Sequence, residues 1–402
     1  MTTGDDERRP QLSRRRLLMG GAAAGVGAVA AVGVDAVWRS SSSPAPPLHG
    51  DETVSFHGTH QAGVTTAPPA HATFLGLDLR DGVDGEALRR LMQILTDDAR
   101  RLTDGRAALA DSEPELATVP ARLSVTFGFG PRFVERAAGT AARPSWLRPL
   151  PAFGIDRLEE RWSDGDLLIQ VAAEDPLTVA HAVRMVLKDS RSFATVRWSQ
   201  TGFRRARGSE RPGTTMRNLF GQVDGTANLA AEEFDRLVWI QEGWLAGGTS
   251  FVMRRIHMDL DEWDRLDRDG REQSVGRRLS NGAPLTGTQE HDEPDFEATN
   301  SLGFPVIAEF SHIRRAHSED PDEQILRRAY NYDLAPSGEE VSDSGLIFGS
   351  FQADVDRQFV PVQRRLDELD LLNKWTVPIG SSVFAIPPGC GPDGYIGETL
   401  LE

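Results

Sequence analysis

The sequence has one cysteine, Cys390, among its 402 residues. This excludes an internal disulfide bond, and it also excludes iron–sulfur clusters and structural zinc sites that several thiolates hold. Positive charge is scarce too, because 44 lysines and arginines are set against 60 aspartates and glutamates, for a formal net charge of -16. Such a chain lacks the basic face that a nucleic-acid partner needs. We therefore expect a protein that an ordinary apolar core stabilises, with no nucleic-acid partner.

Long apolar runs are also scarce, and the clearest one covers residues 17–34. It follows a Ser-Arg-Arg-Arg sequence at residues 13–16 that fits the twin-arginine export pattern. A membrane anchor is the alternative, since about 20 apolar residues span a bilayer, but the many glycines and alanines disfavour it. We predict a signal peptide over residues 1–36, recognised by the twin-arginine translocase, and a Ser- and Pro-rich flexible linker over residues 37–55. The protein would then be extracellular or in the cell envelope, in the periplasm if the host has an outer membrane.

Apolar strands and amphipathic helices alternate along the remaining chain, and this order occurs twice. In the first half, strands are predicted at residues 72–79, 121–127, 166–171 and 193–198, with helices at 85–102 and 176–187 and a short one from 130. In the second half, strands are predicted at residues 250–256, 345–351 and 382–386, with helices at 260–266 and around Phe359, Val362 and Leu366. The repeated order suggests an α+β fold of two duplicated ferredoxin-like units. We place the N-terminal half at 56–215 and the C-terminal half at 216–402.

Three segments carry groups that suit catalysis. Asp224 precedes a glycine within residues 221–226, so a tight turn can present its short carboxylate into a cavity. His312 follows the apolar residues 304–310, so its ring can enter a buried space, as axial ligation of iron requires. A pair of arginines stands at 327–328. Each signal is weak alone, because Asp-Gly turns are common and most histidines bind no metal.

Together these segments resemble one known family, the dye-decolourising peroxidases. Residues 217–228 are similar to its GxxDG region, and residues 56–64 look like its amino-terminal FHGxHQ-type segment. Residues 311–314 and 326–330 match its haem-iron and distal-arginine regions. The four matches occur in one order, and they are closest to the secreted branch that includes the deferrochelatase/peroxidase proteins of bacteria. The resemblance implies the same duplicated, dimeric α+β barrel-like fold, with one haem b per subunit between the halves.

The resemblance places the proximal iron ligand at His312. His317 is a rival, but it opens the polar run 317–323, which is typical of a solvated loop. A haem-ligating imidazole usually donates its other N–H to a carboxylate or a carbonyl. Asp343 and Glu309 are both candidates for that partner, and the sequence does not choose between them.

The resemblance also assigns the distal side. Asp224 would be the acid–base group that moves a proton between the two oxygens of a peroxide, and Arg327 a fixed cation that stabilises the departing oxygen. Arg328 would point elsewhere, toward a propionate or a surface acid. Arg314 is a candidate for a haem propionate. The remaining predicted cofactor-binding residues are Gly225, Thr226, Leu346 and Phe348.

The function that this resemblance implies is a secreted haem peroxidase, which uses hydrogen peroxide to oxidise dyes, phenolics or other small organic reductants. One alternative is a haem-handling protein that releases iron from haem in iron acquisition. A second is a haem-free binding module of the same fold. A homo-oligomer is compatible with each of these functions.

Overall fold

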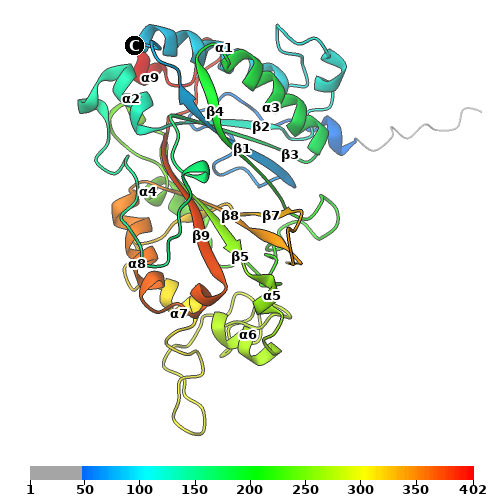
Figure 1. The fold of residues 1–402 in the computed structure, drawn as a ribbon, viewed down its shortest axis with the longest axis vertical. Coiled ribbons are helices and arrows are strands. Elements are labelled where there is room, and N and C mark those ends of the chain that lie inside the picture. The colour runs from blue at the N-terminus through cyan, green and yellow to red at the C-terminus, as the bar shows by residue number, and fades with distance from the viewer. Residues whose placement is uncertain (1–47, 340) are drawn as a thin grey trace, which may run out of the picture. The chain divides into compact units, whose positions relative to one another are not determined.

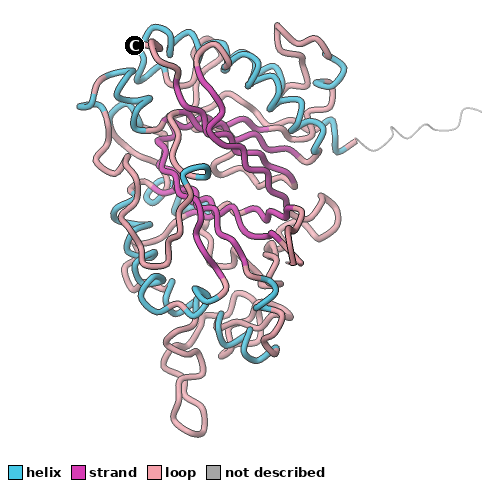
Figure 2. Tube along the Cα trace, in the orientation of Figure 1, coloured by secondary structure: helices cyan, strands magenta, loops and turns pink. Residues whose placement is uncertain are grey.

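Nine strands form the centre of the structure, a computed structural model that describes residues 48–339 and 341–402 (Figures 1 and 2). They lie in the order β5-β9-β2-β3-β1-β4-β7-β8-β6, and β5 also pairs with β8. That additional pairing closes eight of the strands into a ring, with β6 outside it on β8. The strand bounds are β1 His71–Leu79, β2 Ser124–Phe129, β3 Leu167–Ala173, β4 Ala194–Phe203, β5 Thr249–Met258, β6 Leu326–Arg327, β7 Tyr330–Leu334, β8 Asp343–Gln352 and β9 Thr376–Ile386.

The ring consists of two four-stranded units with the same internal order. The first unit runs β4-β1-β3-β2 and the second runs β9-β5-β8-β7, which in both cases is fourth, first, third and second along the chain. This is the antiparallel order of a ferredoxin-like unit, so the predicted duplicated α+β fold is confirmed. The two units meet at narrow seams, through Phe129 opposite Ala385 and Phe203 opposite Asn331. The predicted division after residue 215 falls between β4 and β5, and it stays a prediction.

The helices cover the outer faces of the strands (Figure 1). α1 begins after Asp84, whose side chain accepts a hydrogen bond from the backbone of Ala87, and it buries one apolar stripe. α3 begins in the same way after Asp175, with proline as its first residue. The helix bounds are α1 Gly85–Thr103, α2 Pro131–Ala138, α3 Pro176–Ser190, α4 Phe234–Leu237, α5 Leu260–Trp263, α6 Arg268–Val275, α7 His312–Ala316, α8 Val360–Leu369 and α9 Glu398–Leu401.

The second unit departs from the first between its first two strands. Where the first unit has the single long helix α1, the second has residues 259–329, which hold α5, α6, α7 and the two-residue strand β6. Figure 1 shows these helices at one end of the second unit, with the chain between α6 and α7 projecting beyond them. The helix predicted at 260–266 is shorter than expected, and α6, β6 and β7 were not predicted. α6 has few apolar residues and β6 is very short, so neither has a periodic pattern.

Glycines on the inner faces of the strands make room for large aromatic side chains. Gly76 of β1 lies opposite Trp198 of β4, and a Cβ atom on it would come within 2.2 Å of the indole. The ring interior is therefore a packed core and not a channel. Its aromatic members are Phe74, Trp198, Trp239, Phe251, Tyr330, Tyr332, Phe351 and Phe384.

The predicted signal peptide at residues 1–36 lies outside the described residues, as does the predicted linker up to residue 47. The part of the linker that is described contains a short 3-10 helix, His49–Asp51. Within residues 48–339 and 341–402, none of the helices has both the length and the apolar character needed to span a membrane.

We expect Asp98 to make stability depend on pH. Asp98 is buried on α1, and burial, followed by the neighbouring carboxyl group of Asp189, raises its pKa from 3.8 to about 8. The folded state therefore keeps a proton that the unfolded chain loses above about pH 4, so this contribution is full at low pH and is lost as the pH rises toward 8. Asp98→Asn removes this titration. When the pH is raised from 5 to 8, its free energy of unfolding should therefore change more favourably than that of the unchanged protein, by at least about 1 kcal/mol, the value of one pKa unit.

Urea unfolding of both proteins at pH 5 and pH 8 measures this difference. Asp104→Asn, which removes an exposed carboxylate at the end of the same helix, is the matched control. Parallel pH profiles for Asp98→Asn and the unchanged protein would show that Asp98 is ionised in the fold.

Candidate active site

Asp224 lies on a loop that folds back on itself. Arg217 and Val223 form an isolated antiparallel bridge, and the amide of Asp224 donates a 2.8 Å hydrogen bond to the carbonyl of Met216. Gly225 follows with φ +132°, a conformation that L side chains rarely adopt. The glycine is thus required for the turn that presents the Asp224 side chain, as the sequence suggested.

The carboxylate of Asp224 has two partners. Arg327 Nη1 donates to Oδ1 at 3.1 Å, and Asn218 Nδ2 donates to Oδ2 at 3.3 Å. Asn218 is itself fixed, because its Nδ2 also donates to the side chain of Gln222 at 3.0 Å. The side chains of Asp224 and Arg327 remain 14% and 25% exposed, so both ends of the ion pair are accessible. The structure therefore brings together the predicted distal acid and the predicted distal arginine.

Arg327 reaches Asp224 from β6. This strand pairs with the outer part of β8, where Arg327 lies opposite Ser350. Arg328, the next residue, points the other way, is buried, and donates to the carbonyl of Thr66 at 2.5 Å. Arg328 therefore does not pair with a surface acid, which was one of its two predicted partners.

His312 is the first residue of α7, and its ring contacts the end of α8. Its Nδ1 lies 2.6 Å from Asp370 Oδ2, and the other oxygen of Asp370 accepts from the amide of Leu372 at 3.0 Å. Since a carboxylate oxygen accepts, Nδ1 carries the proton and Nε2 is left to face away from Asp370. Asp370 is buried, so the contact is shielded from solvent.

The electrostatic surroundings of His312 link it to the other two groups. Burial alone would lower the pKa of His312, but the charge and hydrogen bond of Asp370 outweigh it, so the pKa lies above its usual value. The charges of Arg327 and Asp224 have smaller effects, since Arg327 lowers and Asp224 raises the same pKa. Protein atoms surround the His312 ring closely enough to affect its pKa, yet 31% of the His312 side chain is accessible to solvent. The His312 imidazole is therefore within reach of a ligand.

Leu346 and Phe348 lie on the face of β8 that looks toward α6 and α7. Leu346 is buried in a cluster with Trp263, and Ile313 of α7 packs against that cluster. Phe348 is half-buried and also contacts Phe359, with ring centroids 6.3 Å apart. Their predicted role in lining the distal side stays a prediction.

Two of the other predicted residues hold the protein chain itself. Arg314 Nη1 donates to the carbonyls of Phe296 at 2.8 Å and Ile307 at 3.1 Å, which fixes the segment before α7. Thr226 donates to Glu290 at 3.0 Å and so anchors the Asp224 loop. The propionate contact of Arg314 and the cofactor contacts of Gly225 and Thr226 remain predictions.

The predicted carboxylate partners of His312 were wrong. Asp343 lies 3.9 Å from His257, and Glu309 is exposed, whereas Asp370 makes the contact. The sequence offers no signal for Asp370, because it is distant along the chain and meets α7 only through the packing of α8. The rival His317 is exposed, in agreement with its prediction as part of a solvated loop.

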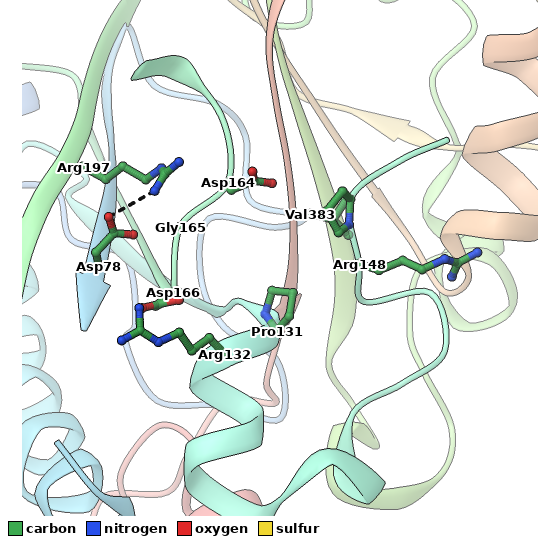
Figure 3. A pocket seen from close by; sticks show the side chains of 10 residues that line it. Asp78, Pro131, Arg132, Arg148, Asp164, Gly165, Asp166, Arg197 and Val383 are labelled. Atoms are coloured by element: carbon green, nitrogen blue, oxygen red, sulfur yellow. Dashed lines mark hydrogen bonds and ion pairs between the residues drawn. The ribbon is translucent and has the colours of Figure 1, made fainter. Parts of the chain in front are cut away.

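Hollows elsewhere on the surface have a different character. Figure 3 shows one of about 330 Å³, which residues of the first unit and Val383 of β9 line. Its charged groups pair with each other, as with Arg197 and Asp78 at 3.2 Å and Arg132 and Asp166 at 3.5 Å. No histidine lines it. We therefore assign the chemistry to the Asp224, Arg327 and His312 cluster.

The donor set at this cluster fits a haem. Among the described residues, no group of three or more His, Cys, Asp or Glu side chains is placed to hold a bare metal ion. His312 instead offers one imidazole nitrogen, with its other nitrogen bound to a carboxylate. One such nitrogen would suffice for an iron whose remaining ligands a macrocycle supplies, and a carboxylate behind the imidazole raises its basicity.

Comparison with known proteins supports this assignment. Family profiles described as "Dyp-type peroxidase, N-terminal" and "Dyp-type peroxidase, C-terminal" match residues 61–204 and 215–391. A dye-decolorizing peroxidase of Thermobifida fusca is 35% identical over 432 residues, covering 100% of both chains, and a deferrochelatase of Escherichia coli is 32% identical over 423 residues, covering 97% of both. A DyP-type peroxidase from Cellulomonas bogoriensis has 54% identity and a TM-score of 0.87, covering 89% of this chain and 100% of its own. Ferric DtpA from Streptomyces lividans has 39% identity and a TM-score of 0.85, with the same coverage.

We expect Asp370→Asn to lower the pKa of His312. The substitution keeps the shape and an acceptor oxygen but removes the negative charge, so burial should then dominate and bring the pKa below its usual value. A fall of one unit or more is expected, by NMR titration of the imidazole in the ligand-free protein. Asp343→Asn, near His257, is the control and should leave His312 unchanged. An equal pKa in Asp370→Asn would mean that this carboxylate does not govern the imidazole.

Proposed function

The chain belongs to the Dyp-type, dye-decolourising peroxidase family, and from that premise we propose that Asp224 and Arg327 act on hydrogen peroxide while His312 holds the haem iron. The protein is a haem peroxidase, an enzyme that uses hydrogen peroxide to oxidise reductants. The observation that carries the residue roles is the 3.1 Å contact between Asp224 and Arg327, two groups whose charges both act on the pKa of His312.

Bound haem supplies the iron at which peroxide is reduced. Asp224 is the one of these side chains that can take a proton from one peroxide oxygen and return it to the other. Arg327 holds the carboxylate in place and provides a permanent positive charge for the oxygen that departs. Asn218 fixes the second carboxylate oxygen, so Asp224 does not depend on Arg327 alone for its orientation.

On the other side, Asp370 sets the tautomer of His312. Because Nδ1 donates to Asp370, the lone pair of Nε2 is available to the iron. The backbone amide of Leu372 in turn holds the Asp370 carboxylate. The orientation of the His312 ring is therefore fixed, through Asp370, by the backbone. Dyes and phenolics are the reductants we propose.

A second candidate function is the release of iron from haem. It is favoured by the relatives named deferrochelatase, which match 97% of this chain. The same site would serve both functions, with haem as cofactor in one and as substrate in the other. Peroxide-dependent dye turnover by the haem-loaded protein supports the first, whereas release of iron with intact porphyrin recovered supports the second.

We also propose export by the twin-arginine route, on the basis of the Ser-Arg-Arg-Arg sequence at residues 13–16 and the apolar run that follows. That route carries folded proteins, which suits an enzyme that acquires its cofactor before transport.

Replacing Asp224 or Arg327 should slow the reaction with peroxide. We expect Asp224→Asn to lower the second-order rate constant by about 10²–10⁴-fold, because proton transfer is lost. We expect Arg327→Leu to lower it by about 10²–10³-fold, because charge stabilisation is lost. Stopped-flow measurement of the spectral change on mixing haem-loaded protein with hydrogen peroxide tests both.

The matched control is Glu293→Gln, which removes an exposed carboxylate from the same half of the chain. Haem content and the resting absorption spectrum must be the same in all three variants. Unchanged rate constants in both Asp224→Asn and Arg327→Leu would reject the assigned roles.

For export, Arg14→Lys combined with Arg15→Lys should leave the protein inside the cell, because the translocase recognises the arginine pair. Immunodetection in cell and exported fractions measures this, with Arg39→Lys as the control. Export of the doubly substituted chain at the level of the unchanged chain would refute the proposed route.

A further inference from the structure

The side chain of Asn228 pairs with the backbone of Arg327 in both directions. Asn228 Nδ2 donates to the carbonyl of Arg327 at 2.8 Å, and the amide of Arg327 donates to Asn228 Oδ1 at 2.7 Å. A carboxamide that gives one hydrogen bond and accepts another from the same residue imitates a neighbouring strand. Its orientation is unambiguous, because only one assignment of its oxygen and nitrogen satisfies both contacts.

This pairing gives the edge of β6 that faces away from β8 a hydrogen-bonding partner. β6 has two residues, and its pairing within the sheet is with β8, where Arg327 lies opposite Ser350. A strand of two residues bonded along one edge is prone to fray. Asn228 holds the opposite edge at the residue whose guanidinium contacts Asp224.

Asn228 is in turn anchored to the loop that carries Asp224. The backbone N–H of Asn228 donates to the carbonyl of Gly225 at 3.1 Å, and this bond closes the turn that follows Asp224. The next residue, Leu229, is buried in the core inside the strand ring. Asn228 therefore belongs to a fixed turn, and it connects the loop of the acid to the strand of the arginine.

We propose that Asn228 is a positioning residue, which sets the separation between the Asp224 carboxylate and the Arg327 guanidinium by clamping the backbone of Arg327. The inference rests on the proposed role of Arg327 in the peroxide reaction. Asn228 acts through the backbone of Arg327, and its own side chain is occupied by that backbone. Because the contact is exposed, its loss leaves no buried polar group unpaired, so the effect should fall on geometry more than on stability.

Hydrogen exchange tests the clamp without reference to activity. In Asn228→Ala the amide of Arg327 loses its acceptor, so exchange in residues 326–328 should accelerate at least 10-fold while β5 and β8 are unchanged. Asn228→Asp keeps an acceptor oxygen and should retain part of the protection. Asn300→Ala, which removes another exposed asparagine that binds backbone amides, is the control. Unaltered exchange at residues 326–328 in Asn228→Ala would overturn the proposal.

A double-mutant cycle tests the functional consequence in the haem-loaded enzyme. Asn228→Ala should lower the rate constant for hydrogen peroxide by 10-fold or more, with haem content and resting spectrum unchanged, since small displacements of a catalytic group are costly. In an Arg327→Ala background the same substitution should change the rate constant less than twofold, because the group it positions is gone.

The role of Arg327 and the positioning role of Asn228 are refuted by different results. If Arg327→Ala does not slow the reaction, the proposed role of Arg327 in the peroxide reaction fails. If Arg327→Ala slows it and Asn228→Ala does not, or if Asn228→Ala slows both backgrounds equally, the positioning role of Asn228 is refuted and the proposed function stands.

Discussion

The backbone pairing of β8 is the constraint on which the site depends. β8 bonds to β5 over residues 344–352, to β7 over residues 343–347 and to β6 over residues 350–351. It thereby closes the strand ring and carries the arginine strand outside that ring. The face it turns toward α6 and α7 bears Leu346 and Phe348, so the same strand supports both Arg327 and this apolar surface. A shift of register by one residue would turn that face inward.

Function follows from the point at which the two ferredoxin-like units differ. In the first unit, the single helix α1 covers the strands with one apolar stripe. In the second unit, residues 259–329 replace that helix with three short helices and a long projecting segment. Three short helices have more ends than one long helix, and each end places a side chain or a backbone group at the surface of the strands. His312 at the start of α7 and Arg327 on β6 are products of that interruption.

The sequence was sufficient for the parts of the fold and site that local pattern determines. Apolar runs and helical periodicity located β1, α1 and α3, and the glycine after Asp224 predicted a turn, whose φ of +132° only glycine adopts readily. Asp370 was out of reach, because its contact with His312 is made by the end of α8 meeting α7, a relation that no local pattern encodes. β6 was missed for a similar reason, since a two-residue strand exists only through its partners on β8 and Asn228.

The site holds its charged groups in opposed pairs, and this shapes how any single substitution must be interpreted. Asp224 neutralises Arg327, and Asp370 accepts the hydrogen bond from Nδ1 of His312, so each carboxylate fixes the geometry of one cationic or basic group. Removing one member leaves the other uncompensated in a partly desolvated place, and the measured loss then includes that penalty. Asn218 reduces the penalty on the Asp224 side, because it still binds the carboxylate when the arginine is absent. On the His312 side no second side chain shares Asp370 Oδ2 among the described contacts, so the imidazole and Asp370 behave as one unit. The pair of His312 and Asp370 should therefore tolerate substitution less well than the pair of Asp224 and Arg327.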